Sequence, residues 1–247
     1  MVAGNRGEQA HGGAAMSQTI QIDVGGDAMD LYVAGPDSAG PHPAVLVCFH
    51  RGGMDAFTRE RVDLLAEAGY VAAAPDFYHR RKCEDSEEAV QHRRDDDVIA
   101  DIAAAVGWLQ AQDRVDDGRI AIMGHCMGGR VAFLGACALP DAFAGVVTYY
   151  GGGMFSAWGE GGPTAFERLP ALRCPVVGFY GNDDTNPSPE QVDRIRAELK
   201  RLGIPYEVHR YDGTGHAFQG AQSPEKYREG PAKESWVRTV AWLGETV

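Results

Sequence analysis

Three short segments of the chain carry side chains that could together perform nucleophilic catalysis. The first is Gly-His-Cys-Met-Gly at residues 124–128, in which a cysteine has a glycine two residues before it and two residues after it. The second holds the adjacent aspartates at 183–184, and the third contains His216. A thiol nucleophile needs a base that accepts its proton, and that base needs a carboxylate that orients it. We therefore expect Cys126 to act as a nucleophile, with an aspartate and His216 as its partners.

The residues around Cys126 predict a sharp turn between a strand and a helix. An apolar run at residues 120–123 precedes it, and a run of mostly small residues at 131–138 follows it. A nucleophile on such a strained turn needs small residues two positions before it and two after it. The positive end of the helix favours thiolate and lowers the thiol pKa. The alternative is an ordinary buried cysteine beside a glycine-flanked turn.

The aspartates and His216 stand where parallel strands are expected to end. The aspartates at 183–184 follow the apolar run at 175–180, and His216 follows the run at 206–211 in a loop with two glycines. The chain order of nucleophile, acid and histidine is the one that this kind of turn requires. The pattern alone leaves either aspartate open as the acid. It also leaves open a turn that the aspartate side chains stabilise.

Short apolar runs alternate with amphipathic stretches along the chain. Such runs are typical of strands buried on both faces of a parallel sheet, and the stretches between them are typical of helices. Two extended runs on either side of a turn at 25–27 predict an antiparallel hairpin at a sheet edge. We expect an α/β fold in a single domain: a doubly wound, mostly parallel sheet with an antiparallel N-terminal hairpin. The expected strands are residues 19–24, 28–33, 44–49, 70–74, 120–123, 144–150, 175–180 and 206–211, and the expected helices are residues 59–68, 98–110, 131–138 and 189–202.

The composition limits the classes of protein that the chain can belong to. A net charge of -12 argues against binding to nucleic acid or to an anionic membrane. Five widely spaced cysteines fit neither a secreted disulfide framework nor a metal motif. No apolar run approaches the ~20 residues that span a bilayer, and the N-terminus lacks a secretory signal. We expect a cytoplasmic monomer or homodimer, with residues 1–16 as a disordered extension and 17–247 as the domain.

Other polar clusters have simpler interpretations. His125, beside the nucleophile, is expected to pack against its neighbours. The acidic run at 95–97 is expected to be a solvated helix start, because carboxylates are favourable near the positive end of a helix. The glycines at 151–153 and 161–162 are expected to form a flexible loop over the site. We expect no metal and no cofactor.

Six segments resemble the dienelactone hydrolase family. The resemblance runs from about residue 19 to the end, on Ala-Phe-Thr-Arg-Glu at 56–60, Ala-Pro-Asp-Phe-Tyr at 74–78, Gly-His-Cys-Met-Gly-Gly at 124–129, Tyr-Tyr-Gly at 149–151, Gly-Asn-Asp-Asp at 181–184 and Gly-His-Ala-Phe at 215–218. It implies the α/β-hydrolase fold, a triad of Cys126, Asp184 and His216, and hydrolysis of cyclic or simple esters. By the same register, the backbone N–H groups of Met127 and Arg51 would bind the oxyanion.

The resemblance also identifies side chains for the substrate pocket, which are His50, Tyr78, Tyr150 and Phe218. In dienelactone hydrolase a glutamate that helps to activate the thiol stands at the position of His50. A histidine there cannot act as that glutamate does. Three roles stay open for it: it could donate to the oxyanion, contact the thiolate or pack.

A second departure concerns the arginines that hold a substrate carboxylate in dienelactone hydrolase. One of them lies four residues beyond the catalytic histidine, where this chain has Gly220. Arg93 and Arg94 could replace the other arginine, or they could simply form a charged helix face. We therefore expect a hydrolase acting on a small-molecule ester or lactone. Two alternatives are a non-catalytic small-ligand-binding protein of the same fold, and a thioesterase or peptidase on that fold.

Overall fold

The computed structural model describes residues 16–81, 88 and 91–247. Of the predicted extension at 1–16, residues 1–15 lie outside the described residues, and Met16 is already the first residue of a strand. That strand therefore begins three residues before the predicted position 19. The division of the chain into an extension and a domain stays a prediction.

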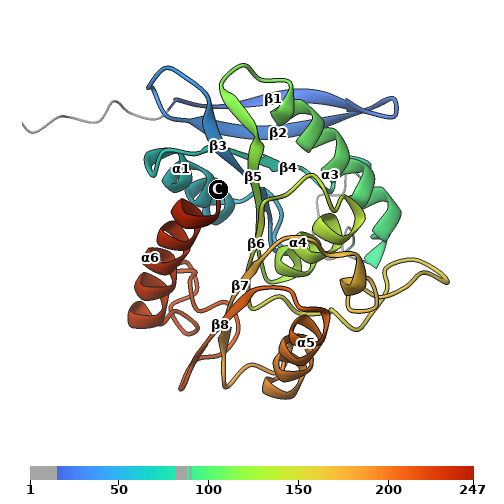
Figure 1. Ribbon diagram of the computed structural model, residues 1–247, viewed down its shortest axis with the longest axis vertical. Helices are drawn as coiled ribbons and strands as arrows, with labels where there is room; N and C mark the ends of the chain where they lie inside the picture. Colours follow the sequence, from blue (N-terminus) through green and yellow to red (C-terminus); the bar gives the residue numbers. More distant parts are fainter. Residues whose placement is uncertain (1–15, 82–87, 89–90) are drawn as a thin grey trace, which may run out of the picture.

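Eight strands form one mixed sheet, seen nearly edge-on in Figure 1. The strands are β1 (Met16–Val24), β2 (Asp27–Gly35), β3 (His42–Cys48), β4 (Val71–Pro75), β5 (Val115–His125), β6 (Gly145–Tyr149), β7 (Val176–Gly181) and β8 (Tyr206–Tyr211). Their order across the sheet is β1-β2-β4-β3-β5-β6-β7-β8. The pairs β1–β2 and β2–β4 are antiparallel and all others are parallel. The mostly parallel sheet with its antiparallel N-terminal hairpin is thus confirmed.

The hairpin and β5 show how local sequence sets strand bounds. The turn between β1 and β2 uses Gly25 and Gly26, whose φ angles are 64° and 97°, a backbone region that glycine enters without steric cost. β5 begins at Val115, five residues before the predicted position 120. Its first part is polar and partly exposed, and its pairing with β3 is irregular there. The apolar pattern therefore marked only the buried half of β5.

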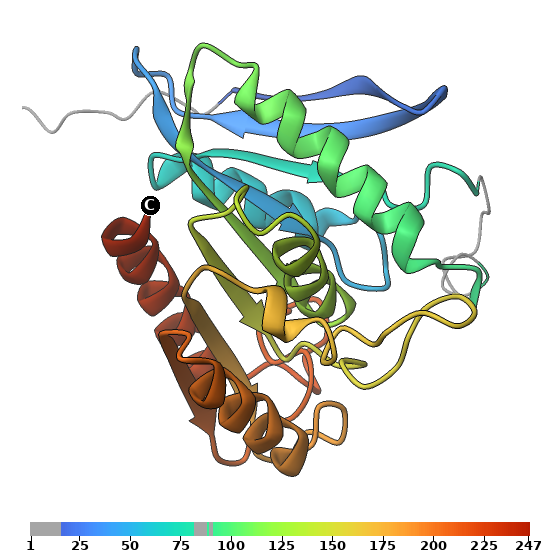
Figure 2. The same ribbon diagram turned by 45° about the vertical axis from the view of Figure 1, so that its right-hand side comes forward.

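Helices cover both faces of the sheet, as Figures 1 and 2 show. α1 (Ala56–Glu67) and α6 (Glu229–Thr246) lie on one face, and α3 (Asp95–Gln110), α4 (Met127–Ala138) and α5 (Pro189–Leu202) lie on the other. A short 3-10 turn, η1 (Leu169–Ala171), precedes β7. The four predicted helices are confirmed, and α5 matches its predicted bounds. The sequence pattern did not predict α6.

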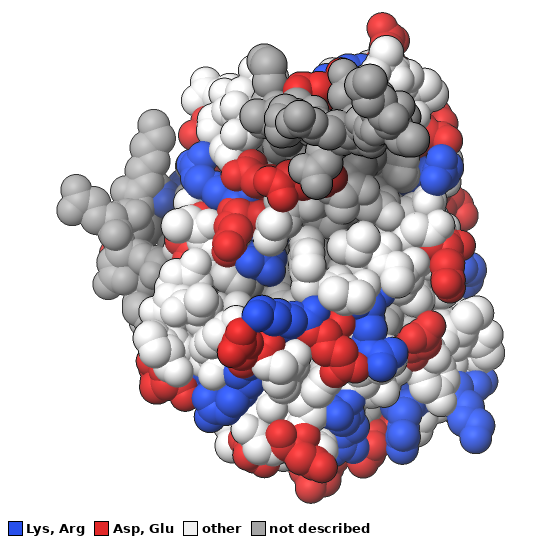
Figure 3. Space-filling view, turned by 90° about the vertical axis from the view of Figure 1, so that its left-hand side faces the viewer, with Lys and Arg blue, Asp and Glu red and all other residues white. Residues whose placement is uncertain are grey.

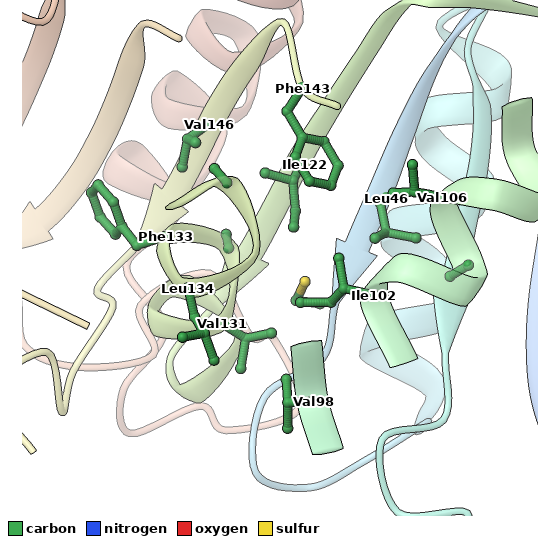
Figure 4. Close-up of a cluster of buried hydrophobic side chains, with 14 of the residues drawn as sticks. Leu46, Val98, Ile102, Val106, Ile122, Val131, Phe133, Leu134, Phe143 and Val146 are labelled. Atoms are coloured by element: carbon green, nitrogen blue, oxygen red, sulfur yellow. The ribbon is translucent and has the colours of Figure 1, made fainter. Parts of the chain in front are cut away.

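The core is divided by the sheet into two layers of buried side chains. The layer between the sheet and α3, α4 and α5 appears in Figure 4, where Leu46, Ile102, Ile122 and Val131 point toward one another. A Cβ added at Gly135 of α4 would lie 2.9 Å from Cδ1 of Ile102, so α3 and α4 pack closely because this position is glycine. This packing fixes α4, and with it the turn that precedes α4, against β5.

The acidic start of α3 is only partly solvated: Asp96 is exposed as the sequence had indicated, but Asp95 is buried. Asp95 is 4% exposed and forms two hydrogen bonds, of 2.7 and 3.0 Å, with the guanidinium of Arg130. Arg130 is fully buried and also donates to the carbonyls of Gly153, at 3.1 Å, and Ser156, at 2.8 Å. Buried charges need such paired, hydrogen-bonded settings. The interpretation was wrong for Asp95 because its partner lies 35 residues away in the chain.

The face that α1 and α6 cover carries charges of both signs. Figure 3 shows Lys and Arg side chains interspersed with Asp and Glu over the described part of this face. On α6, Lys233 contacts Glu229 and Arg238 contacts Glu234, each at a spacing of four residues. Among the described helices, none is both long enough and apolar enough to span a bilayer.

Candidate active site

Cys126 occupies the turn between β5 and α4. β5 ends at His125 and α4 begins at Met127, so Cys126 is the single residue between them. Its φ of 56° and ψ of -120° are unusual for a residue with a side chain. Such a conformation costs on the order of 1–3 kcal/mol and persists only where the surrounding structure enforces it. The predicted sharp turn is present.

Three glycines explain how the chain can enforce this turn. A Cβ at Gly124 would overlap the carbonyl oxygen of Gly128, and a Cβ at Gly128 would overlap the carbonyl oxygen of Cys48 in β3. A Cβ at Gly129 would lie 2.6 Å from Oγ1 of Thr148 in β6. The first turn of α4 therefore sits directly on the ends of the neighbouring strands. Only glycine permits that approach.

His216 connects Cys126 to Asp184. The imidazole lies close enough to the Cys126 thiol for each group to shift the pKa of the other. Its Nδ1 lies 2.8 Å from Oδ2 of Asp184, whose side chain is 2% exposed. The other oxygen of Asp184 accepts the N–H of Asn186 at 2.9 Å, while the neighbouring Asp183 is exposed. Of the two aspartates, it is Asp184 that the structure brings against His216.

The contacts between Cys126 and His216 shift both of their pKa values. Burial raises the pKa of Cys126, but the hydrogen bond and charge of His216 and the Met127 N–H outweigh burial and lower it. Burial lowers the pKa of His216, but its bonds to Asp184 and Cys126 and their charges outweigh burial and raise it to about 10. At neutral pH both shifts favour a thiolate beside an imidazolium.

Two backbone segments border the sulfur where the oxyanion donors were predicted. Met127 is the first residue of α4, and its N–H lowers the pKa of the neighbouring Cys126 thiol. Arg51 follows β3, and its carbonyl oxygen accepts the hydroxyl of Tyr78 at 3.0 Å. The Tyr78 hydroxyl also lies 3.6 Å from the sulfur of Met127. Tyr78 thus connects the two segments.

Two cavities meet at Cys126, one of about 430 Å³ and one of about 220 Å³. Both are lined by Cys126, His216, Arg51 and Lys226. Residues found only in the larger cavity include Arg93, Gly152, Gly153, Trp158, Thr185 and Asn186. Residues found only in the smaller cavity include His50, Asp55, Phe57, Tyr150, Gln222 and Ser223. The glycines at 152–153 therefore do border the site, as the sequence had indicated.

The four side chains predicted for the substrate pocket occupy different places. His50 and Tyr150 line the smaller cavity. Tyr78 lies beside both backbone segments, as described above. Phe218 is fully buried, and its ring packs on Tyr150 at 5.2 Å and on Tyr211 at 5.5 Å between centroids. It supports the wall of the smaller cavity from behind.

His125 packs as expected. It is 2% exposed, stacks on Tyr149 at 4.5 Å and shares a hydrogen bond of 2.8 Å with Gln219. Burial, followed by the charge of Arg61, lowers its pKa to about 3. His125 is therefore a neutral side chain of the core beneath the site.

The sequence analysis missed two polar groups of the cavities. Lys226 is an isolated lysine in a polar loop, and no local pattern marks it. Asp55 contacts His50 at 2.9 Å and also accepts the N–H of Thr58 at the start of α1. Its position before a helix could have been recognised as a helix cap. Among the described residues, no group of three or more His, Cys, Asp and Glu side chains is arranged to hold a metal ion.

The chain is similar to several known proteins along nearly its whole length. Residues 29–247 match the family described as the dienelactone hydrolase family. A protein of Methylorubrum extorquens named "Putative carboxymethylenebutenolidase" is 30% identical over 234 residues, which cover 91% of this chain and 79% of that protein.

Two solved structures resemble the fold closely. A "Putative Dienelactone Hydrolase" from Klebsiella pneumoniae subsp. pneumoniae has a TM-score of 0.85 and 29% identity, covering 94% of this chain and 99% of that one. A dienelactone hydrolase-like promiscuous phosphotriesterase from metagenomic libraries has a TM-score of 0.83 at 20% identity, covering 95% and 99%. The second likeness concerns the fold alone. Together they confirm the expected fold.

Proposed function

Because the chain belongs to the dienelactone hydrolase family, we propose that this hydrolase cleaves a carboxylic ester or lactone with Cys126 as its nucleophile. His216 is the base and Asp184 the carboxylate that orients it. The observation that carries the proposal is the placement of His216, which lies beside Cys126 in both cavities and is hydrogen-bonded to Asp184 at 2.8 Å. The Cys126 thiol is held on a strained turn, where a nucleophile is exposed to substrate.

The first half of the reaction forms a thioester. The Cys126 thiolate attacks the carbonyl carbon, and the carbonyl electrons move to its oxygen. The backbone N–H groups of Met127 and Arg51 stabilise this oxyanion, and such donors typically contribute about 3–4 kcal/mol each. The imidazolium of His216 then gives its proton to the departing alkoxide as the carbon–oxygen bond breaks. Asp184 keeps the imidazole oriented throughout.

The second half of the reaction releases the acid. His216, now neutral, accepts a proton from water, and the hydroxide attacks the thioester carbonyl. The same two N–H groups stabilise the second oxyanion. When that intermediate breaks down, the carbon–sulfur bond opens, the carboxylic acid is released and the thiolate is restored beside the imidazolium.

The lining of the larger cavity supports a substrate that carries an anionic group. Arg51, Arg93 and Lys226 border it, whereas the carboxylate of Asp184 is already paired with His216. Nε of Arg93 is buried with no hydrogen-bond partner among the described residues. The relatives' name describes a lactone that bears a carboxyl group. Lys226 comes from the loop after His216, in which Gly220 stands at the position of the family's arginine.

The proposal is tested with a chromogenic short-chain ester and with mass spectrometry of the quenched protein. The wild-type chain should hydrolyse the ester and carry an acyl adduct on Cys126. Cys126→Ala should lose both, and Cys126→Ser should keep a trace of activity because His216 can serve either nucleophile. Cys48→Ala is the matched control, because Cys48 is a buried cysteine whose pKa burial raises far above its usual range. Full esterase activity in Cys126→Ala would refute the mechanism.

A further inference from the structure

We propose that His50 is a positioning residue that fixes the direction of the Arg51 backbone N–H. The inference rests on the proposed function, in which that N–H is one of the two oxyanion donors. It replaces the three roles that the sequence left open for His50 with one that follows from its contacts. His50 holds the loop that carries the donor.

Both ring nitrogens of His50 are engaged within its own loop. Nδ1 accepts the backbone N–H of Gly52 at 3.1 Å. Because a backbone N–H can only donate, Nδ1 carries no proton and the ring proton is on Nε2. Nε2 lies 2.9 Å from Oδ2 of Asp55 and donates to it. Neither nitrogen is therefore available to donate a hydrogen bond to the Cys126 sulfur or to an oxyanion.

Two consecutive peptide groups are held by these and neighbouring contacts. The carbonyl of His50 accepts the N–H of Gly53 at 3.0 Å, which orients the peptide group that includes the Arg51 N–H. The next peptide group is held on both sides: its carbonyl, from Arg51, accepts the Tyr78 hydroxyl, and its N–H, from Gly52, donates to His50. Peptide groups are planar, so these contacts fix the dihedral angles between them. The direction of the Arg51 N–H follows.

The orientation of the His50 ring is itself set by a helix. Asp55 caps α1, because its Oδ1 accepts the N–H of Thr58 at 3.0 Å while its Oδ2 receives His50. A Cβ at Gly52 would lie 3.0 Å from Nδ1 of His50 and closer still to its Cε1, so the ring packs directly on the loop backbone. A series of contacts thus runs from the start of α1 through Asp55 and His50 to the Arg51 segment.

Two conservative substitutions separate the contacts of His50. Asparagine places an acceptor near the position of Nδ1 and can hold Gly52, but it does not reach Asp55. Glutamine reaches Asp55 but presents no acceptor to Gly52. Because an oxyanion forms only in the transition state, a misplaced donor lowers kcat rather than raising KM. We expect His50→Gln to lower kcat by about 100-fold with KM within about threefold, since small displacements at such sites cost on that order.

The remaining measurements distinguish this role from thiol activation. Alkylation of Cys126 by iodoacetamide forms no oxyanion, so its rate should stay within about twofold of wild type in His50→Gln at neutral pH. His50→Asn should recover at least about tenfold of the lost kcat. His209→Gln is the matched control, because His209 also contacts a carboxylate, Glu207 at 3.1 Å, and stacks on an aromatic ring. It should behave as wild type.

Each alternative outcome overturns a specific claim. A wild-type kcat in His50→Gln would overturn the positioning role. Equal losses of kcat and of the alkylation rate in His50→Gln would also overturn the positioning role. They would indicate that His50 activates the thiol. If the wild-type chain hydrolyses the ester with no acyl adduct on Cys126, the proposed function is refuted. The positioning role of His50 is then refuted as well, because it rests on that function. Thermal unfolding of each variant establishes that it is folded.

Discussion

Replacing Asp184 by asparagine is expected to lower the share of Cys126 that is present as thiolate, although the substitution changes no atom of Cys126. Asp184 is buried, lies 2.8 Å from Nδ1 of His216 and favours the imidazolium form. A hydrogen bond to a charged group is worth about 1.5–3 kcal/mol. Losing it shifts the balance from the thiolate–imidazolium pair toward the neutral thiol–imidazole pair by that amount, roughly one to two pKa units. The ratio of thiolate to thiol at pH 7 should therefore fall about tenfold to hundredfold.

The assay is the rate of iodoacetamide alkylation at pH 7 divided by its rate at pH 10, where the thiol is ionised in either protein. This ratio of alkylation rates should fall in Asp184→Asn, and kcat for the ester should fall by at least the same factor. Asp183→Asn is the control, because Asp183 is the exposed neighbour and its backbone N–H contacts Thr214 instead. If Asp184→Asn keeps the wild-type ratio, or if Asp183→Asn lowers it equally, the reasoning is refuted.

Three further outcomes are expected. Lys226→Met should raise KM about tenfold for a lactone that carries a carboxylate and leave KM for a neutral ester within about twofold, since it removes one cavity cation; an equal rise for both substrates would contradict this role. Gly128→Ala should cost about 1–3 kcal/mol or more in urea unfolding, because its Cβ would overlap the backbone of β3; an unchanged midpoint would contradict the packing. His125 has a pKa near 3 when folded and about 6.5 when unfolded, so protons bind the unfolded chain first and stability is lost as pH falls from 6.5 toward 3. Between pH 7 and pH 5 this loss is about 2 kcal/mol, and the pH dependence of urea unfolding should be flatter in His125→Gln.

The sequence predicted those elements whose signals are local. Each parallel strand is a short apolar run because both of its faces are buried, and the glycines around Cys126 mark a turn because no other residue fits there. The antiparallel hairpin was predictable from two glycines at its turn. The positions of Cys126, Asp184 and His216 at one edge of the sheet follow from the rule that parallel strands end together. Their catalytic roles stay predictions.

The features that the sequence could not predict depend on distant partners. α6 buries Ser235 and Thr239 because the Tyr149 hydroxyl forms hydrogen bonds with the Ser235 carbonyl and the Thr239 hydroxyl, so its apolar periodicity is weak. Lys226 reaches the cavities from a loop with no local pattern. In each case the partner is absent from the neighbouring sequence.

The buried pair of Asp95 and Arg130 limits the substitutions that this sequence can accept at either position. Replacing either residue alone leaves the other charge buried without its partner, which typically costs about 3–5 kcal/mol. That is a large share of the stability of an ordinary domain. Since Arg130 also holds the carbonyls of the loop that borders the larger cavity, a lone replacement would disturb the substrate side of the molecule as well. Variants that dispense with this pair must therefore acquire both changes together, and a homologue that lacks one of the two charges is expected to lack the other.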